Sequence, residues 1–293
     1  EKALIIDPDY AEAYNNLGNL LTDLEQLDDA IKNYKRAIEI NPNFAEAYQN
    51  LGNAFRYLSQ LDNALKCFEK AIEINPTYSL AYHLLGIVFK DLNQPDDAIQ
   101  SYDKAIAIEP DIEYVLGSKL STKLKFCNWS DLSTLLEDLT NGINNDKKVV
   151  DPFNFLGLTD NPMLQRQVTE IRVKNHLPKN NVLPKINRYP RHQKIRIGYF
   201  SADFRNHPIT TLTAELYEMH DRSHFEIHAF SFGPDTNDEM KLRIKSGVDH
   251  FHDVDSMPHN EIALLARSLE IDIAVDLAGF TAKSGKGVFT MSV

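Results

Sequence analysis

A repeat of 34 residues constrains the first part of this chain more than any other feature. A Leu-Gly pair, two alanines, aromatic residues and a closing proline recur at fixed offsets, and the prolines are Pro8, Pro42, Pro76 and Pro110. We expect each unit to be a pair of helices, which the proline ends because it cannot continue the helix behind it. Stacked pairs bury a shared core and leave a concave groove.

Small residues in the repeat explain how its helices come close together. One glycine falls in each expected first helix and one alanine in each second helix: Gly18, Gly52, Gly86, Ala30, Ala64 and Ala98. The pattern resembles the tetratricopeptide repeat, whose anchors it matches at nearly every position. Three full repeats are followed by a fading one at 111–124, and the residues before Pro8 resemble the tail of an earlier repeat. We therefore expect an array over 1–115 that begins partway through a longer series.

Asparagines recur on the side of the first helices that is expected to face the groove. They are Asn16, Asn19, Asn50 and Asn53, and the third repeat has Leu84 and Ile87 in their place. Asparagine is a modest helix former, so matched pairs need a reason. Side-chain amides both donate and accept, which suits them to hold the backbone of an extended peptide. The alternative, that these are simply solvated polar positions, is equally compatible with the sequence.

Residues 116–190 lose the repeat anchors and are expected to form a helical connector followed by a proline-rich linker. One helix is expected after a cap at Asn128 or Ser130, with leucines on one face, and another from Pro162 onward. Trp129, the single tryptophan, is expected to be a core or interface anchor. Three prolines in 177–192 indicate an extended segment, so we place a domain boundary near 190.

Residues 191–293 alternate strand and helix patterns. Strands are expected at 194–201, 225–232, 250–254 and 271–277, and helices at 208–220, 239–246 and 259–269. This alternation predicts a mostly parallel sheet with helices on both faces, a Rossmann-like unit without the GxGxxG fingerprint. The polar loop 201–207 follows the first strand and precedes a helix that begins at Pro208. Such loops are where α/β folds collect their chemistry.

Two other groups of polar residues invite a functional interpretation that we do not favour. His250 and His252 are expected on one face of a strand and Asp253 on the other, so without further ligands they predict solvated or interface histidines rather than a metal site. Asp272 and Asp276 share a strand face but lie roughly 13 Å apart, too far for an acid/base pair. The sequence therefore predicts no metal ligands.

The α/β half resembles the first catalytic lobe of the O-linked N-acetylglucosamine (O-GlcNAc) transferase family, and its connector resembles that of the bacterial members. The resemblance rests on KIRIGYFSADFRNHP, FEIHAFSFGPD, HFHDV and IDIAVDLAGFT, and repeats ahead of this lobe are that family's arrangement. It implies a two-lobed GT-B enzyme that transfers N-acetylglucosamine from UDP-GlcNAc to Ser or Thr of proteins, without a metal or other cofactor. It also implies that this chain lacks the donor-binding lobe and is inactive alone.

The resemblance assigns roles to individual residues. His207 matches the histidine of the family's Asn-His-Pro motif and is the expected base, because imidazole titrates near neutral pH. Asp203 and Asn206 share its loop and are expected to orient it or the substrate. Gly279 and Thr281 match a Gly-Tyr-Thr segment near the active site, with Phe280 replacing the tyrosine. The alternative for His207 is that it only caps the helix at Pro208.

The composition of the chain limits the classes of partner that it can bind. Its net charge of −11 disfavours binding to nucleic acid and to anionic membranes. Two cysteines, Cys67 and Cys127, make no disulfide framework, and no apolar run is long enough to span a membrane, so we expect a cytoplasmic protein. The expected partner is a protein or peptide acceptor in the groove, and the oligomeric state stays open.

An alternative function is a non-catalytic peptide-binding scaffold. A third function, that of a nucleotide-sugar epimerase, is disfavoured by the repeats.

Overall fold

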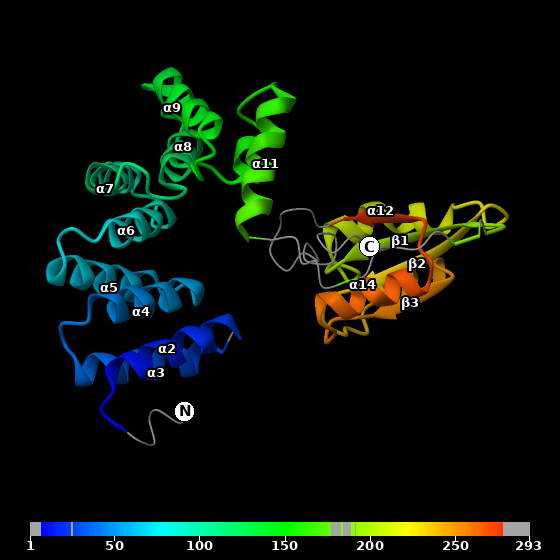
Figure 1. Cartoon of the computed structure of the whole chain (residues 1–293), viewed down its shortest axis with the longest axis horizontal. Helices are drawn as coiled ribbons and strands as arrows, with labels where there is room; N and C mark the ends of the chain where they lie inside the picture. The colour runs from blue at the N-terminus through cyan, green and yellow to red at the C-terminus, as the bar shows by residue number, and fades with distance from the viewer. Residues whose placement is uncertain (1–6, 25, 177–182, 184–188, 191, 278–293) are drawn as a thin grey trace. The chain divides into compact units, whose positions relative to one another are not determined.

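The computed structural model describes residues 7–24, 26–176, 183, 189–190 and 192–277. The chain forms two compact units, Glu1–Ile171 and Arg172–Val293, and each is described here by itself. Figure 1 shows the helical first unit in blue to green and the α/β second unit in yellow to red. No helix in the described ranges has both the length and the apolar character needed to cross a membrane.

Three helix pairs form the repeat array, as the spacing predicts. They are α2 (Ala11–Asp23) with α3 (Leu27–Ile40), α4 (Ala45–Tyr57) with α5 (Leu61–Ile74), and α6 (Ser79–Asp91) with α7 (Pro95–Ile108). Figure 1 shows the pairs stacked one on the next. The alanines of the second helices are buried: Ala30, Ala64 and Ala98. Each first-helix glycine lies against the aromatic ring of its own second helix, Tyr34, Phe68 or Tyr102, so that the two backbones approach closely.

The helices after the array pack around their own apolar core. They are α8 (Val115–Lys125), α9 (Leu132–Asn144), α10 (Pro152–Phe155) and α11 (Pro162–His176). The fully buried members of this core are Leu120, Leu139, Ile143 and Phe155, from α8, α9 and α10. The predicted helix beginning at Pro162 is confirmed, and so are the inward-facing leucines of α9.

For the turn before α9, the predicted helix cap and the predicted core position of Trp129 are wrong. The residue at the helix start is Asp131, with a left-handed backbone (φ 53°) and no side-chain capping bond. The Asn128 side chain instead accepts hydrogen bonds from the Ser130 amide (3.1 Å) and hydroxyl (2.6 Å), which makes a local turn one step earlier. Trp129, in that turn, is 61% exposed and is no core anchor, because the turn projects it away from the α8–α9 core.

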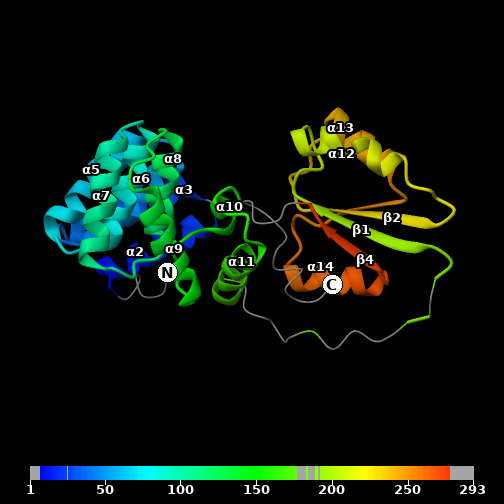
Figure 2. The ribbon, with the colours of Figure 1, turned by 90° about the horizontal axis from the view of Figure 1, so that it is seen from above.

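The second unit contains a parallel four-stranded sheet of order β3-β2-β1-β4. Its strands are β1 (Ile195–Ser201), β2 (Phe225–Ser231), β3 (His250–Asp253) and β4 (Ile273–Asp276), and its helices are α12 (Pro208–Glu218), α13 (Glu239–Gly247) and α14 (His259–Ser268). Figure 2 shows α12 and α13 over one face of the sheet and α14 over the other. The predicted order and type of every element are confirmed.

Alternation along the strands divides the sheet into two cores. Ile197, Tyr199 and Ile227 pack under α12 and α13, where Tyr217 is fully buried. Phe200 and Phe230 stack on the opposite face, with ring centroids 4.3 Å apart, against α14. Because the strands are buried on both faces at their carboxyl halves, the loop after β1 starts from a rigid base.

Candidate active site in the loop after β1

The loop that joins β1 to α12 is fixed by hydrogen bonds at both of its ends. The Asp203 amide donates to the Ser201 hydroxyl (3.0 Å), and the Phe232 amide donates to the Ser201 carbonyl (3.0 Å). At the other end, the Thr210 hydroxyl donates to the Asp203 carbonyl, which ties the first turn of α12 to the loop. The polar residues of SADFRNHP are therefore presented at the carboxyl edge of the sheet, as the sequence predicts.

His207 is the N-cap of α12. Its backbone is extended (φ −148°, ψ 147°), and its Nδ1 accepts a hydrogen bond from the Ile209 amide at 3.3 Å. The same Nδ1 lies 3.8 Å from Asp203 Oδ2, and the His207 side chain is 33% exposed. The same nitrogen, His207 Nδ1, therefore caps the helix and lies near Asp203, the carboxylate that would orient a base.

These two contacts require opposite protonation of Nδ1. Accepting from Ile209 requires a bare Nδ1, which leaves the neutral ring with its proton on Nε2. Donating to Asp203 requires a proton on Nδ1 and frees the Nε2 lone pair to take a proton from a substrate. At 3.3 Å the capping contact is the shorter, and at 3.8 Å the Asp203 contact is too long for a hydrogen bond.

The neighbours of His207 complete the polar loop. Asn206 is exposed, and Arg205 Nη2 lies 3.5 Å from the other carboxylate oxygen of Asp203. Within the described residues, the buried Arg205 Nε has no hydrogen-bond partner. Asp203 thus lies between a guanidinium and an imidazole. The predicted site residues Gly279 and Thr281 lie outside the described residues.

The four groove asparagines have different surroundings. Asn16 is exposed, whereas Asn19 accepts from the Tyr34 hydroxyl at 2.8 Å and Asn53 accepts from Arg56 at 3.1 Å. The Asn50 side chain donates to Asn15 Oδ1 at 2.9 Å, from α4 to α2. Three of the four therefore already have protein partners, and Asn16 is the one most open to a ligand.

Family models match both units. The glycosyl transferase family 41 model matches residues 169–292, and tetratricopeptide-repeat models match 1–32, 18–56, 45–78 and 67–100. A protein of Arabidopsis thaliana described as a probable UDP-N-acetylglucosamine–peptide N-acetylglucosaminyltransferase is 34% identical over 99 residues, which are 34% of this chain and 10% of that protein. A Caenorhabditis elegans UDP-N-acetylglucosamine–peptide N-acetylglucosaminyltransferase is 29% identical over 100 residues, 34% of this chain and 9% of that protein.

A solved structure joins the two units in one architecture. A mutant O-GlcNAc transferase of Thermobaculum terrenum superposes with a TM-score of 0.54 at 20% identity, over 96% of this chain and 48% of that one. At this identity the likeness shows the fold, which is repeats followed by a parallel α/β lobe. The chain resembles O-GlcNAc transferases, and its residues 169–292 match glycosyl transferase family 41.

The chain corresponds to part of the length of these proteins. It spans about a tenth of the two curated relatives and about half of the bacterial structure. The family 41 match includes β1, the SADFRNHP loop and all of the described sheet. The loop around His207 therefore lies within the segment that matches the glycosyltransferase family, and the repeats precede that segment.

The repeats also hold a buried polar series that we did not predict from the sequence. Asn15, Gln49 and His83 are buried at the same offset in successive repeats. Each reaches the following unit: Asn15 donates to Glu46 (3.0 Å), Gln49 accepts from the Tyr78 hydroxyl (3.0 Å), and His83 Nε2 lies 2.9 Å from Ser118 Oγ. Their 34-residue spacing was a signal in the sequence that could have found them.

A hollow of about 610 Å³ lies between α7, α8 and the turn before α9. Its lining carries both signs of charge, from Asp96, Asp103, Asp131, Lys104, Lys119 and Lys123. Lys119 pairs with Asp103 at 2.5 Å, and Lys123 donates to the Ser130 carbonyl at 2.6 Å. None of the groove asparagines lines it, so this hollow is distinct from the predicted acceptor groove.

Proposed function

We propose that this chain is the acceptor side of a protein O-GlcNAc transferase. In this proposal the enzyme moves N-acetylglucosamine from UDP-GlcNAc to Ser or Thr hydroxyls, and the repeats present the acceptor protein to the α/β lobe. The match of residues 169–292 to glycosyl transferase family 41 supports the reaction class, and the exposed Asn16 in the repeat array supports peptide binding. The reaction uses no metal, and the donor is held by a lobe beyond these residues.

The observation that carries the proposal is the proximity of His207 Nδ1 to Asp203 Oδ2, 3.8 Å apart in the loop after β1. In the reaction, the acceptor oxygen bonds to the anomeric carbon as the bond from that carbon to UDP breaks. The acceptor proton passes to His207 Nε2, and the leaving charge stays on the UDP phosphate. Asp203 accepts from Nδ1–H and stabilises the imidazolium that forms. His207 must first release the Ile209 amide, so this loop tightens around Asp203 when the acceptor binds.

Substitution at His207 separates the base from the helix cap. In a longer protein that contains the whole transferase region, His207→Asn keeps an excellent N-cap residue but removes the titrating group. We expect turnover to fall about 100- to 10,000-fold in His207→Asn, because that is the usual contribution of a general base. Its thermal stability should stay within a degree or two of wild type's.

His207→Ala is the matched comparison, since it removes the cap as well. It should lose the same turnover and about 1 kcal/mol of stability in addition. Sugar transfer to a peptide is measured with radiolabelled UDP-GlcNAc, and stability by thermal unfolding. If His207→Asn transfers sugar at the wild-type rate, His207 is only a cap and the mechanism needs another base. If wild type itself transfers no sugar but binds peptide through the repeats, the scaffold alternative is correct.

A further inference from the structure

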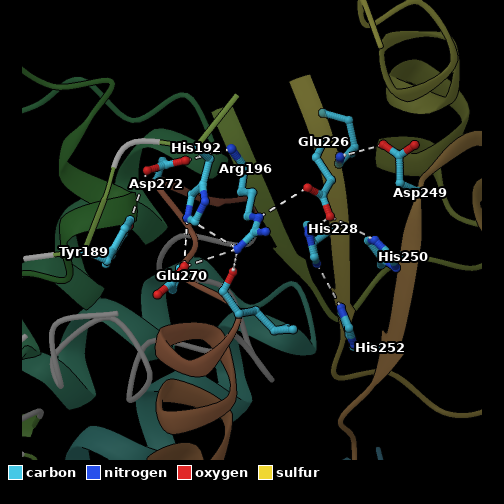
Figure 3. A network of polar contacts seen from close by, with 12 residues as sticks. Tyr189, His192, Arg196, Glu226, His228, Asp249, His250, His252, Glu270 and Asp272 are labelled. Carbon is cyan, nitrogen blue, oxygen red and sulfur yellow. Dashed lines mark hydrogen bonds and ion pairs between the residues drawn. The ribbon is translucent and has the colours of Figure 1, made fainter. Parts of the chain in front are cut away.

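One carboxylate and three imidazoles cluster on β2 and β3 (Figure 3). Glu226 and His228 are two residues apart on β2, and His250 and His252 are two residues apart on β3, so each pair lies on one face of its strand. The register pairs His228 with His250, so all four side chains project from one face of the sheet. The ring centroids of His228 and His250 are 4.6 Å apart, which brings residues distant in sequence into direct contact.

The spacing of the ligand atoms suits a tetrahedral cation. Glu226 Oε1 lies 3.0 Å from His250 Nε2 and 3.4 Å from His228 Nε2. One ligand atom from each of the three residues lies within 4.8 Å of the others. Bonds of 2.0–2.2 Å from a central zinc ion place tetrahedral ligand atoms roughly 3.3 Å apart. The two distances to Glu226 are already close to that value, and the His228–His250 separation is at most 4.8 Å.

His228 supplies a second, independent observation. Its side chain is 3% exposed, and its Nε2 makes no hydrogen bond in the part of the chain that the structure describes, although Glu226 Oε1 lies 3.4 Å away. A buried polar nitrogen without a hydrogen bond requires an explanation. The other nitrogen, Nδ1, lies 3.1 Å from His252 Nε2. When Nδ1–H donates to His252, the Nε2 lone pair points toward Glu226 and His250, as in histidines that bind metal while a neighbour holds their other nitrogen.

Arg196 Nε lies 3.2 Å from the other oxygen of Glu226, Oε2, so Oε1 remains available to the histidines. Arg196 also pairs with Glu270 at 3.5 Å, so two carboxylates surround this one guanidinium. The positive charge of Arg196 is therefore balanced by carboxylates and does not oppose a cation at this site.

We propose that Glu226, His228 and His250 bind one divalent transition-metal ion of the Zn²⁺ type, with His252 holding His228 in its ligating tautomer. Two imidazole nitrogens and a carboxylate oxygen are ligands that Zn²⁺ accepts, and a water completes the tetrahedron. The half-exposed His250 gives the ion access. The ion joins β3, the edge strand of the described sheet, to β2 and so has a structural role.

This site is separate from the proposed transfer reaction. Glu226 is the second residue of β2, whereas the His207 loop follows the carboxyl ends of the strands, about five residues or roughly 16 Å along the sheet. The sequence alone predicted no metal, because only the His250-x-His252 spacing was visible there. Glu226 and His228 join it through the β2–β3 register.

The test is calorimetric titration of the metal-free 293-residue chain with ZnCl₂ at pH 7.5. Wild type should bind one Zn²⁺ per chain, and binding should weaken at least 10-fold in His250→Ala and in Glu226→Gln. Both variants alter a partly exposed side chain and leave the buried His228 in place. His259→Ala, which removes an exposed histidine at the start of α14, is the matched control and should bind like wild type.

Thermal unfolding gives a second readout, since a ligand that binds the folded state raises the melting temperature. ZnCl₂ should raise it for wild type and His259→Ala, but not for His250→Ala or Glu226→Gln. The proposal is overturned if wild type takes up no Zn²⁺, or if both ligand variants bind it as tightly as the control. Neither outcome bears on sugar transfer.

Discussion

At the scale of single residues, the buried His83 makes the folding stability of the array depend on pH. Burial, with smaller contributions from Lys90 and Arg56, lowers the pKa of His83 from 6.5 to about 4. The unfolded chain therefore takes up a proton near pH 6.5 while the folded chain stays neutral, so stability is complete above that pH and falls as the pH drops toward 4. At ~1.4 kcal/mol per pKa unit, His83 alone removes up to ~3 kcal/mol across this range.

Replacing His83 with glutamine isolates this effect, because Gln49 occupies the same repeat position one unit earlier. We expect His83→Gln to lose less stability than wild type between pH 7 and pH 4, by up to ~3 kcal/mol. Denaturant unfolding at both pH values measures the difference, which cancels contributions from other groups such as His252. Equal pH dependence in the two proteins would mean that His83 is already protonated, or already solvated, in the folded array.

At the scale of elements, the glycine of each first helix sets how closely a repeat packs. A Cβ at Gly86 would lie 2.5 Å from a Tyr102 ring carbon and 3.0 Å from the Ala98 carbonyl, whereas one at Gly52 would lie 2.9 Å from the Phe68 ring. Overpacking costs about 1–3 kcal/mol, and alanine regains up to about 1 kcal/mol of helix propensity. We expect Gly86→Ala to destabilise the array by about 1–2 kcal/mol and Gly52→Ala by less.

Urea unfolding followed by circular dichroism ranks these variants. Gly157→Ala is the control, because a Cβ there would meet nothing within 4 Å. If close packing limits stability, Gly86→Ala should lose the most stability, Gly52→Ala should lose less, and Gly157→Ala should lose the least. If Gly86→Ala were as stable as Gly157→Ala, the helix pair would have enough freedom to move apart, and the close approach would not limit stability.

Elements with a strong local period were predictable from the sequence, and single-residue environments were less so. The 34-residue repeat and the apolar alternation of β1 and β2 are periodic patterns that can be read directly from the sequence. They therefore predicted the type and the order of the helices and strands. Trp129 was misplaced because one residue carries no period: hydrophobicity predicts burial, but the turn closed by Asn128 and Ser130 projects it outward. Asp131 was missed as a helix start because its left-handed backbone makes no side-chain cap.

At the scale of the whole molecule, contacts between distant residues are what local patterns cannot supply. His228 and His250 meet only because β2 and β3 pair in one register, and a shift of one residue would turn His250 to the other face. The Asp203–His207 pair was predictable because both residues lie in one loop. The competition between Asp203 and the Ile209 amide for Nδ1 was not, since it depends on how α12 begins.

The proposed division between acceptor and donor sides makes a prediction for the chain as a whole. A diphosphate needs convergent backbone N–H groups or cations. The loop after β1 offers Arg205, but Asp203 already lies 3.5 Å from that guanidinium. We therefore expect calorimetric titration of the 293-residue chain with UDP to show no binding at micromolar concentrations, while a protein that includes the donor lobe binds it. Micromolar binding by the 293-residue chain would place the nucleotide site within 192–293 and remove the basis for calling this half the acceptor side.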